Sequence, residues 1–392
     1  MARTSVQSEF SQRDLGRWRL LEDFQRRIEQ NTQASALHRS FLSSRRKFLQ
    51  SDYLSLFLFG LLNPVVNTMR GLCFASQLPR VQEEICGRPV SLGSFSEAQH
   101  VLDPSLLERV FAQLGQELHQ QQSGAGPAAK PAWLIQDSTL WEALPRMSWA
   151  LWRTQGTTQR AVRLHLSLHL LDDAPVRAKV TMGAYCERKA WKEEWQEGDA
   201  YIGDRNFGSD YKIFGRLNAK HCTYILRLTD RAKIQIEEEL PVTEEDRAQG
   251  VIRQAWARLG SQTCYRSARV RLVWVQGPEE VLVLVTNQKP EELSAGLVSQ
   301  MYRCRWQIEL FFRWIKCILG CRHWLAESPE GVAIQVYLAL IAALLLQLYT
   351  GRRPTKRMME LIRFYLVGMA TLEDLEAGLE KEKARLSRQT KN

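Results

Sequence analysis

The pattern of apolar and polar positions changes along the chain. From residue 54 to residue 118 apolar residues recur at helical spacing, with proline and glycine at intervals, which predicts a small helical domain. Beyond residue 132 the apolar runs become short, and in 161–171 hydrophobic and polar residues alternate. Alternation of this kind is typical of a half-buried strand, and the next run, 176–185, completes a predicted antiparallel hairpin.

Two short apolar runs end in an aspartate. Residues 132–136 lead into Asp137, and residues 200–203 lead into Asp204. We therefore expect both aspartates at the carboxyl ends of buried strands, where side chains of neighbouring strands converge on a shared cleft. Each aspartate taken singly is also a common turn or cap residue. Further β-type runs predict a strand-rich segment at 230–290.

Residues 299–319 have the pattern of one long helix with two different faces. At about 100° per residue, an arc of roughly 60° contains the side chains of Tyr302, Arg305, Glu309 and Lys316. Trp306 and Arg313 border this arc, and the opposite side is a continuous apolar stripe. The glutamate therefore lies among cations. One interpretation is a salt-bridged residue on an ordinary amphipathic helix, and the other is a metal ligand beside bound phosphate.

Composition indicates the nature of the partner. The chain has 392 residues, 45% of them hydrophobic, and a formal net charge of +10. It is long enough for two or three domains. An anionic partner, most simply nucleic acid, is expected for so basic a chain, and the basic segment 1–50 is a predicted phosphate-facing arm. We find no secretory signal, and the eight cysteines lack the spacing of a disulfide framework, which predicts a reducing cytoplasm.

Three other patterns are interpreted as structural. The run 332–349 approaches membrane-spanning length, but polar residues interrupt it, so we expect a buried core helix and no membrane. His165 and His169 share a predicted strand, which places them about 13 Å apart, too far to hold one ion. The C-x3-C-x-H motif at 317–323 lacks a fourth ligand and is expected to be buried.

Three acidic residues, considered together, predict a metal site. Asp137, Asp204 and Glu309 occur in that order, two at predicted strand ends and one on a packed helix. Carboxylates are ligands that Mg²⁺ and Mn²⁺ prefer, and two such ions about 4 Å apart support phosphodiester cleavage. The set therefore predicts a site for two Mg²⁺ ions, with Mn²⁺ able to substitute.

These residues resemble a known family. The spacing Tyr302-x2-Arg305-x3-Glu309-x6-Lys316 is similar to the Tyr-Arg-Glu-Lys signature of the DDE transposases of the bacterial insertion-sequence-four family. The sequences around the two aspartates resemble that family's acidic motifs, and the resemblance extends over residues 132–350. It implies an α/β fold with a ribonuclease H-like (retroviral-integrase-like) catalytic core, a β-rich insertion, a helical N-terminal DNA-binding domain and a helical C-terminal tail.

The resemblance also implies roles for individual residues. Asp137, Asp204 and Glu309 would be catalytic and hold the metal ions. The DNA-binding side chains would be Tyr302, Arg305, Lys316, Trp306, Arg313 and Arg205. The partners would be double-stranded DNA, both transposon ends and target DNA, bound by a homodimer in the bacterial cytoplasm. Water would attack the phosphodiester at the end of the element, and the freed 3′-hydroxyl would then attack target DNA.

Six segments follow from the pattern and the resemblance together. They are a helical DNA-binding region with a basic arm (1–120), a linker (121–131), the first part of the core (132–229), the insertion (230–290), core helices with the signature (291–350) and a helical tail that would support dimerisation (351–392).

The resemblance leaves one step and two other functions open. Relatives of this kind free the element through a DNA hairpin, with a tryptophan stacking a flipped base. The strand before the signature helix has no tryptophan here, so Trp274 or Trp256 would have to substitute, unless both are packing residues. The two alternatives are a catalytically inactive or domesticated DNA-binding protein and a ribonuclease H-like host nuclease.

Overall fold

The computed structural model describes residues 19–33, 50–63, 65–66, 68–123, 132–154, 157–260, 267–321 and 323–389. The chain forms two compact units. Residues 1–118 with 314–392 make the helical unit, and residues 119–313 make the sheet unit. Much of the predicted basic arm, and residues 124–131 of the predicted linker, lie outside the described residues.

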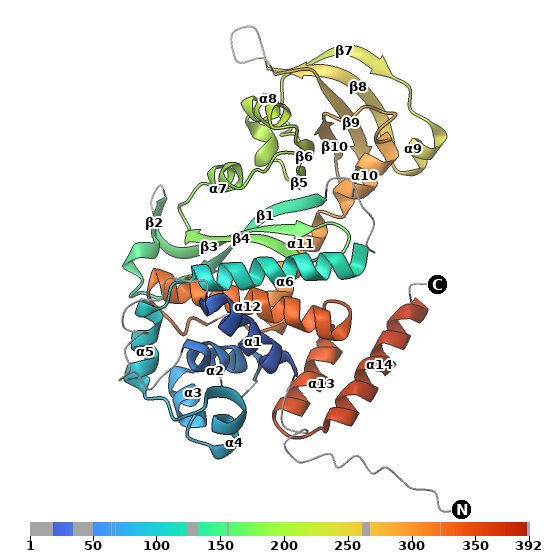
Figure 1. The fold of residues 1–392 in the computed structure, drawn as a ribbon. Coiled ribbons are helices and arrows are strands. Elements are labelled where there is room, and N and C mark those ends of the chain that lie inside the picture. Colours follow the sequence, from blue (N-terminus) through green and yellow to red (C-terminus); the bar gives the residue numbers. More distant parts are fainter. Residues whose placement is uncertain are drawn as a thin grey trace, which may run out of the picture. The chain divides into compact units, whose positions relative to one another are not determined.

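The helical unit is built around the apolar helix α12, Pro329–Thr350 (Figure 1). Its sequence is apolar on almost every side, which is typical of a helix surrounded by protein. The helices that pack against it are α1 (Arg19–Gln33), α2 (Gln50–Leu62) and α5 (Leu92–Val101). Helix α12 is long and apolar enough to cross a membrane, but 89% of its most apolar stretch is buried inside the structure. It is a buried helix, as the sequence predicts.

The remaining helical elements of this unit are mostly shorter. They are α3 (Met69–Ala75), α4 (Pro79–Val81), the π-helical turn Gln82–Cys86, α6 (Ser105–Ser123), the π-helical turn Trp314–Ile318, α13 (Lys356–Leu366) and α14 (Leu372–Gln389). Helix α6 continues beyond Leu118, and its residues from His119 onward belong to the sheet unit. The expected burial of the C-x3-C-x-H motif holds for Cys321 but is wrong for Cys317 and His323, which are exposed.

In the described residues of the sheet unit, ten strands form one sheet (Figure 1). Its first strands are β1 (Trp133–Glu142), β2 (Leu151–Thr154), β3 (Thr157–His169), β4 (Pro175–Met182), β5 (Ala200–Gly203) and β6 (Thr223–Arg227). Strand β3 pairs antiparallel with β1, β2 and β4, whereas β5 runs parallel to β1 and to β6. The predicted β3–β4 hairpin is confirmed, and this mixed sheet is consistent with a ribonuclease H-like core.

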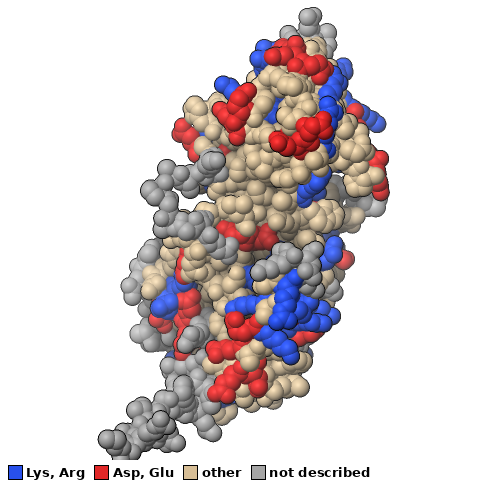
Figure 2. All heavy atoms as spheres, turned by 90° about the vertical axis from the view of Figure 1, so that its right-hand side faces the viewer, with Lys and Arg blue, Asp and Glu red and all other residues tan. Residues whose placement is uncertain are grey.

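The sheet continues from β6 into the segment predicted to be rich in strands. The added strands, in order from β6, are β10 (Val281–Thr286), β9 (Val270–Gln276), β8 (Val251–Leu259) and β7 (Ile234–Leu240). A short helix, α9 (Glu244–Ala248), connects β7 to β8. Arginines of β8 pair with glutamates of the neighbouring β7, and Arg269, just before β9, pairs with Glu238 of β7. Basic and acidic side chains therefore mix on this surface (Figure 2). The strand-rich segment therefore extends the core sheet.

The helix predicted at 299–319 is not continuous. Helices α10 (Ala295–Arg303) and α11 (Trp306–Arg313) are separated by a two-residue turn that contains Arg305, and a π-helical turn follows α11. Backbone hydrogen bonds at this turn span three residues, as from Arg305 N to Tyr302 O at 3.0 Å, instead of the four of an α-helix. The prediction of one helix is therefore wrong, because the chain tightens locally at Arg305.

Two helices, α7 (Glu187–Glu193) and α8 (Lys212–Ala219), pack on the sheet near β5 and β6. Together with these strands they bury an apolar core rich in aromatic rings, including Trp191, Phe214 and Tyr224. Burial of a large apolar side chain contributes about 1.5–3 kcal/mol. This core therefore holds the parallel strands β5 and β6 in place, and Asp204 directly follows β5.

Arg271 is a buried cation on β9. Its side chain donates to Gln254 Oε1 on β8 at 2.9 Å, to the backbone oxygen of Leu293 at 2.6 Å and to that of Gln288 at 3.2 Å. Burial lowers the pKa of Arg271 to about 10. These bonds tie β9 to the segment that leads into α10, and hence to the turn that holds Arg305.

Replacement of Arg271 by methionine is expected to lower the stability by about 2–5 kcal/mol, because buried acceptors lose their donor. The thermal midpoint, followed by near-ultraviolet circular dichroism, measures this loss. The control Arg269→Met removes a nearby exposed arginine that pairs with Glu237 and Glu238, and it should change the midpoint little. An equal fall in both variants would contradict the role given to Arg271.

Candidate active site

Asp137 lies in the middle of β1. The sequence predicts that the strand ends at this residue, which is wrong, because β3 pairs with β1 as far as Glu142. The neighbour on the other side, β5, ends earlier, and its last residue, Gly203, pairs with Gln136. Asp137 therefore lies just beyond the end of the parallel pairing.

Asp204 directly follows β5. Gln136 and Gly203 are partners in parallel strands that run roughly 4.8 Å apart, so the next residues on each strand, Asp137 and Asp204, are neighbours. A tight turn fixes the second aspartate, because Asp204 Oδ1 accepts the backbone N–H of Asn206 at 2.9 Å. Both predicted acidic motifs thus meet where β5 ends, beside the middle of β1.

Glu309 and Arg305 approach from α11 and the turn before it. Helix α11 packs against β1. Arg305 donates from Nη2 to Glu309 Oε1 at 2.7 Å and from Nη1 to Asp137 Oδ2 at 3.4 Å. One guanidinium therefore joins the acid on the strand to the acid on the helix, and both carboxylates face the same position.

Tyr302 contributes to this cluster from α10. The sequence predicts it on an exposed face, which is wrong, since its side chain is only 8% exposed. Burial raises the pKa of Tyr302, which the nearby cations Arg305 and Arg227 oppose in part. The phenol is therefore protonated at neutral pH and can donate a hydrogen bond.

The electrostatics of the cluster centre on Asp137. Burial, with the negative charges of Glu187 and Asp204, raises the pKa of Asp137 to about 7. The backbone N–H of Ser138, which donates to Asp137 Oδ1 at 2.7 Å, and the charge of Arg305 oppose the rise only in part. A perturbed carboxyl among other acids is typical of a functional site that binds a cation.

Glu187 is a fourth acid near Asp137, and it was not predicted. It is the first residue of α7, and its Oε2 accepts from Asn206 Nδ2 at 2.6 Å in the turn after Asp204. An acidic residue in the first turn of a helix is common for electrostatic reasons alone. Nothing in the local sequence distinguishes Glu187, and only the fold brings it close to Asp137.

The chemistry of the acids suits a hard divalent cation. Mg²⁺ and Mn²⁺ prefer carboxylate oxygens as ligands, and Asp137, Asp204 and Glu309 all offer them. The donor set contains only oxygen, and the Arg305 guanidinium already supplies a positive charge between two of its members. The residues fit Mg²⁺ or Mn²⁺.

The other side chains predicted to bind DNA are more exposed or lie elsewhere. Trp306 is 52% exposed, and Arg313 and Arg205 are also exposed, with Arg205 Nη1 4.0 Å from Asp230 Oδ2. Lys316 lies half-buried in the π-helical turn and belongs to the helical unit. The described sheet unit thus brings Tyr302 and Arg305 to the acids.

A second group of possible ligands was also not predicted. His119, His169 and Asp172 each place one ligand atom within 4.8 Å of the others, and in the described part of the chain no other three such side chains do so. His165 is not part of the group, and its Nε2 lies 3.0 Å from Thr181 Oγ1. The strand spacing indicates that His165 and His169 do not share an ion, and His165 is indeed outside the group. The same spacing cannot reveal that His119, on helix α6, lies close to His169.

Comparison with known families gives a match over more than half of the chain. The family described as Transposase DDE domain matches residues 129–345. This range contains Asp137, Asp204 and Glu309.

Individual relatives are distant. A protein named as a transposase of insertion sequence element IS5377, from Geobacillus stearothermophilus, is 22% identical over 245 residues, which are 62% of this chain and 63% of that protein. The match thus spans less than two thirds of that relative. A protein named as a transposase of insertion sequence element IS4SA, from Synechocystis, is 23% identical over 271 residues, 67% of this chain and 72% of that protein.

A solved structure is similar at a low level. The cryo-EM structure of the piggyBac transposase synaptic complex with hairpin DNA covers 85% of this chain and 72% of its own, with a TM-score of 0.41 and 11% identity. A similarity of this degree supports no argument about the site.

The raised pKa of Asp137 predicts an unusual effect on stability. The pKa of Asp137 is about 7 in the folded protein, whereas the ordinary value, expected in the unfolded chain, is near 4. The folded protein therefore becomes less stable as the pH rises from about 4 to about 7, because Asp137 ionises more readily in the unfolded chain. Without divalent ions at pH 8, Asp137→Asn should therefore be more stable than the wild type by about 2–4 kcal/mol, with a higher thermal midpoint. The difference should shrink at pH 5.

Asp210→Asn is the matched control for this prediction. Burial would raise the pKa of Asp210, but Lys192, whose Nζ donates to Asp210 Oδ2 at 3.1 Å, holds it below its usual value. This variant should therefore lose stability at pH 8. A lower midpoint for Asp137→Asn at both pH values would contradict the account of Asp137.

Proposed function

The chain belongs to the transposase DDE domain family, and we propose that it is a DNA transposase that cleaves the terminal inverted repeats of an insertion sequence and joins the freed 3′-hydroxyl ends to target DNA. The observation that carries this proposal is the meeting of Asp137, Asp204 and Glu309 near the Arg305 guanidinium. The family supports this class of reaction, and the cluster would supply the residues for it.

Asp137, Asp204 and Glu309 would hold two Mg²⁺ ions, for which Mn²⁺ would substitute. Such ions, when bound, make water a stronger nucleophile and stabilise the charge on the leaving oxygen. The donor set of oxygen alone and the pKa of about 7 for Asp137 support a cation site. Because ligand carboxylates must be ionised, loading the site would release the proton of Asp137.

Arg305 would exchange partners when the site is loaded. With divalent ions bound to the acids, the guanidinium would be held less strongly by Asp137 and Glu309 and would be available to a DNA phosphate, which an arginine can bind through two hydrogen bonds. Tyr302 lies beside it, and its protonated phenol can donate to the same phosphate. Arg305 would thus form its ion pairs with Asp137 and Glu309 when no metal ion is bound, and the phosphate contact expected from the sequence when metal ions and DNA are bound.

The exposed side chains would extend the contact with DNA. Arg313 and Arg205 are suited to phosphates, and the exposed ring of Trp306 is suited to stacking on a base. Lys316 would add a further phosphate contact. The partners would be the double-stranded transposon ends and target DNA, bound by a homodimer to which the helices α13 and α14 contribute.

A hairpin step would need a tryptophan that can take up a base. Both candidates already stack on an arginine, Trp274 at 4.7 Å from Arg253 and Trp256 at 4.9 Å from Arg269, measured from Cζ to the ring centroid. A flipped base would have to displace the guanidinium or stack beside it.

A DNA assay separates the proposal from its alternatives. A duplex that carries the terminal repeat, incubated with the protein and Mg²⁺, should be cut at the end of the repeat and then joined to target DNA. Binding without cutting would favour an inactive or domesticated DNA-binding protein. Cutting without regard to sequence would favour a host nuclease.

In this assay, alanine at Asp137, Asp204 or Glu309 is expected to reduce cleavage on the order of 10³-fold or more, while binding to the repeat changes little. Each substitution removes a metal ligand but no DNA contact. Asp210→Ala serves as the control, since it removes a carboxylate of the same unit that pairs with Lys192, and it should cleave normally. Equal losses of binding and cleavage in the three variants would refute their role as metal ligands.

Lys316→Ala should weaken binding to the repeat in a salt-dependent way. Loss of one phosphate contact is expected to reduce the slope of log K against log salt concentration by about 1. Lys356→Ala provides a comparison, because Lys356 is an exposed lysine of α13 whose Nζ lies 3.9 Å from Glu360 Oε1. A slope for Lys316→Ala equal to that of the wild type would exclude the phosphate contact.

A further inference from the structure

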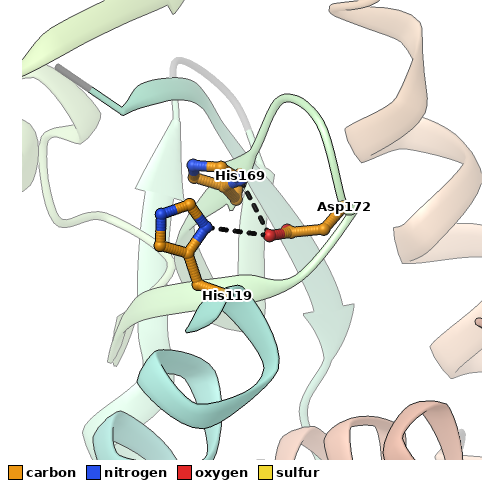
Figure 3. Close-up of side chains that lie close together, drawn as sticks. All are labelled: His119, His169 and Asp172. Carbon is orange, nitrogen blue, oxygen red and sulfur yellow. Dashed lines mark hydrogen bonds and ion pairs between the residues drawn. The ribbon is translucent and has the colours of Figure 1, made fainter. Parts of the chain in front are cut away.

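His119, His169 and Asp172 come from three separate places and face one another (Figure 3). His119 lies near the end of α6, His169 is the last residue of β3, and Asp172 lies in the turn between β3 and β4. They are distinct from the acidic cluster. His169 pairs with Leu134 of β1, three positions along the strand from Asp137, a distance of about 10 Å.

Both imidazoles approach the same carboxylate oxygen. Asp172 Oδ2 lies 3.1 Å from His119 Nδ1 and 3.0 Å from His169 Nδ1. The side chains of Asp172 and His169 are buried, whereas that of His119 is 31% exposed. The backbone N–H of Ala174 donates to the other oxygen, Oδ1, at 2.9 Å, and so fixes the orientation of the carboxylate.

The spacing of these atoms suits a bound metal ion. Zn²⁺ binds imidazole nitrogen and carboxylate oxygen at about 2.0–2.2 Å in a tetrahedron, which places neighbouring ligand atoms roughly 3.3 Å apart. The two distances from Asp172 Oδ2, 3.1 Å and 3.0 Å, are close to that value. The group is therefore nearly in place for a metal ion, without rearrangement of the fold.

His169 supplies an independent observation. Its Nδ1 pairs with Asp172 Oδ2 at 3.0 Å, whereas its buried Nε2 has no hydrogen-bond partner among the described residues. A buried polar nitrogen without such a bond is uncommon, and an unobserved ion is one of its known causes. A metal ion beside Asp172 Oδ2 would be bound by His169 Nδ1, the ring nitrogen that lies next to that oxygen.

We propose that His119, His169 and Asp172 bind one Zn²⁺ ion, with water as the fourth ligand. Two imidazoles and a carboxylate form a donor set that zinc uses, whereas the set of carboxylates at the other site suits Mg²⁺. The exposed edge of His119 gives the ion a way in. The ion would join His119 to the β3–β4 hairpin and stabilise this part of the sheet unit.

Equilibrium dialysis against Zn²⁺, followed by metal analysis, tests this proposal. The full chain should carry Asp137→Asn and Glu309→Gln, so that the acidic cluster does not contribute. This protein is expected to retain one Zn²⁺ per chain, and Co²⁺ in its place should give the visible absorption of tetrahedral Co²⁺. Addition of His119→Ala should weaken Zn²⁺ binding by about 100-fold or more.

His221→Ala in the same background is the control. His221 is an exposed histidine of the sheet unit, remote from the group in sequence, and its loss should leave Zn²⁺ binding unchanged. Zinc should also raise the thermal midpoint of this control but not that of the His119→Ala protein. Both readouts are independent of DNA cleavage.

The proposal is overturned if the background protein retains no Zn²⁺, or if His119→Ala binds it as tightly as the His221→Ala control. In either case the two histidines only pair with the carboxylate. Should His119→Ala fail to fold, as judged by circular dichroism, Asp172→Asn replaces it, because asparagine keeps the shape of the side chain. That variant must then lose zinc affinity to the same extent.

Discussion

The candidate active site depends on one constraint: several carboxylates lie close together in a partly buried position. A parallel strand pair places Asp137 beside Asp204, and a helix packed on β1 adds Glu309. Carboxylates arranged in this way repel one another unless a cation lies among them. The Arg305 guanidinium supplies one positive charge, yet the pKa of Asp137 remains near 7. Burial is the main reason that the charged form of Asp137 is disfavoured, and the neighbouring acids add to it. A divalent ion bound here would favour the charged form, so the metal-free site is destabilised and suited to a cation.

Two features of the backbone create this arrangement. Strand β5 ends at Gly203, level with Gln136, which leaves the next residue of each strand beside the other. The turn between α10 and α11 sets Arg305 within reach of both Asp137 and Glu309. The strand-rich segment continues the core sheet from β6, and the buried Arg271 connects it to the start of α10. The site is thus held by hydrogen bonds that cross several strands.

Local sequence predicted the elements better than their ends and contacts. The alternation in 161–171 predicted the hairpin, and the two apolar runs before the aspartates predicted strands, which are the start of β1 and β5. The end of β1 and the turn at Arg305 were missed because pairing with neighbouring strands and local tightening of the helix leave no periodic signal. Glu187 and His119 were missed because they meet their partners only through the fold. The sequence allowed two interpretations of this helix, salt bridges between its side chains or a metal ligand beside bound phosphate. The structure has the Arg305–Glu309 ion pair, and phosphate binding by Arg305 stays a proposal.

The most direct test of the account is a crystal structure of the protein with Mn²⁺, measured at a wavelength where manganese scatters anomalously. Anomalous density among Asp137, Asp204 and Glu309, with the Arg305 guanidinium moved away from Asp137, is the predicted result. Absence of density at these carboxylates at saturating Mn²⁺, with Arg305 still bonded to Asp137 and Glu309, would contradict the claim that the acids form a metal site.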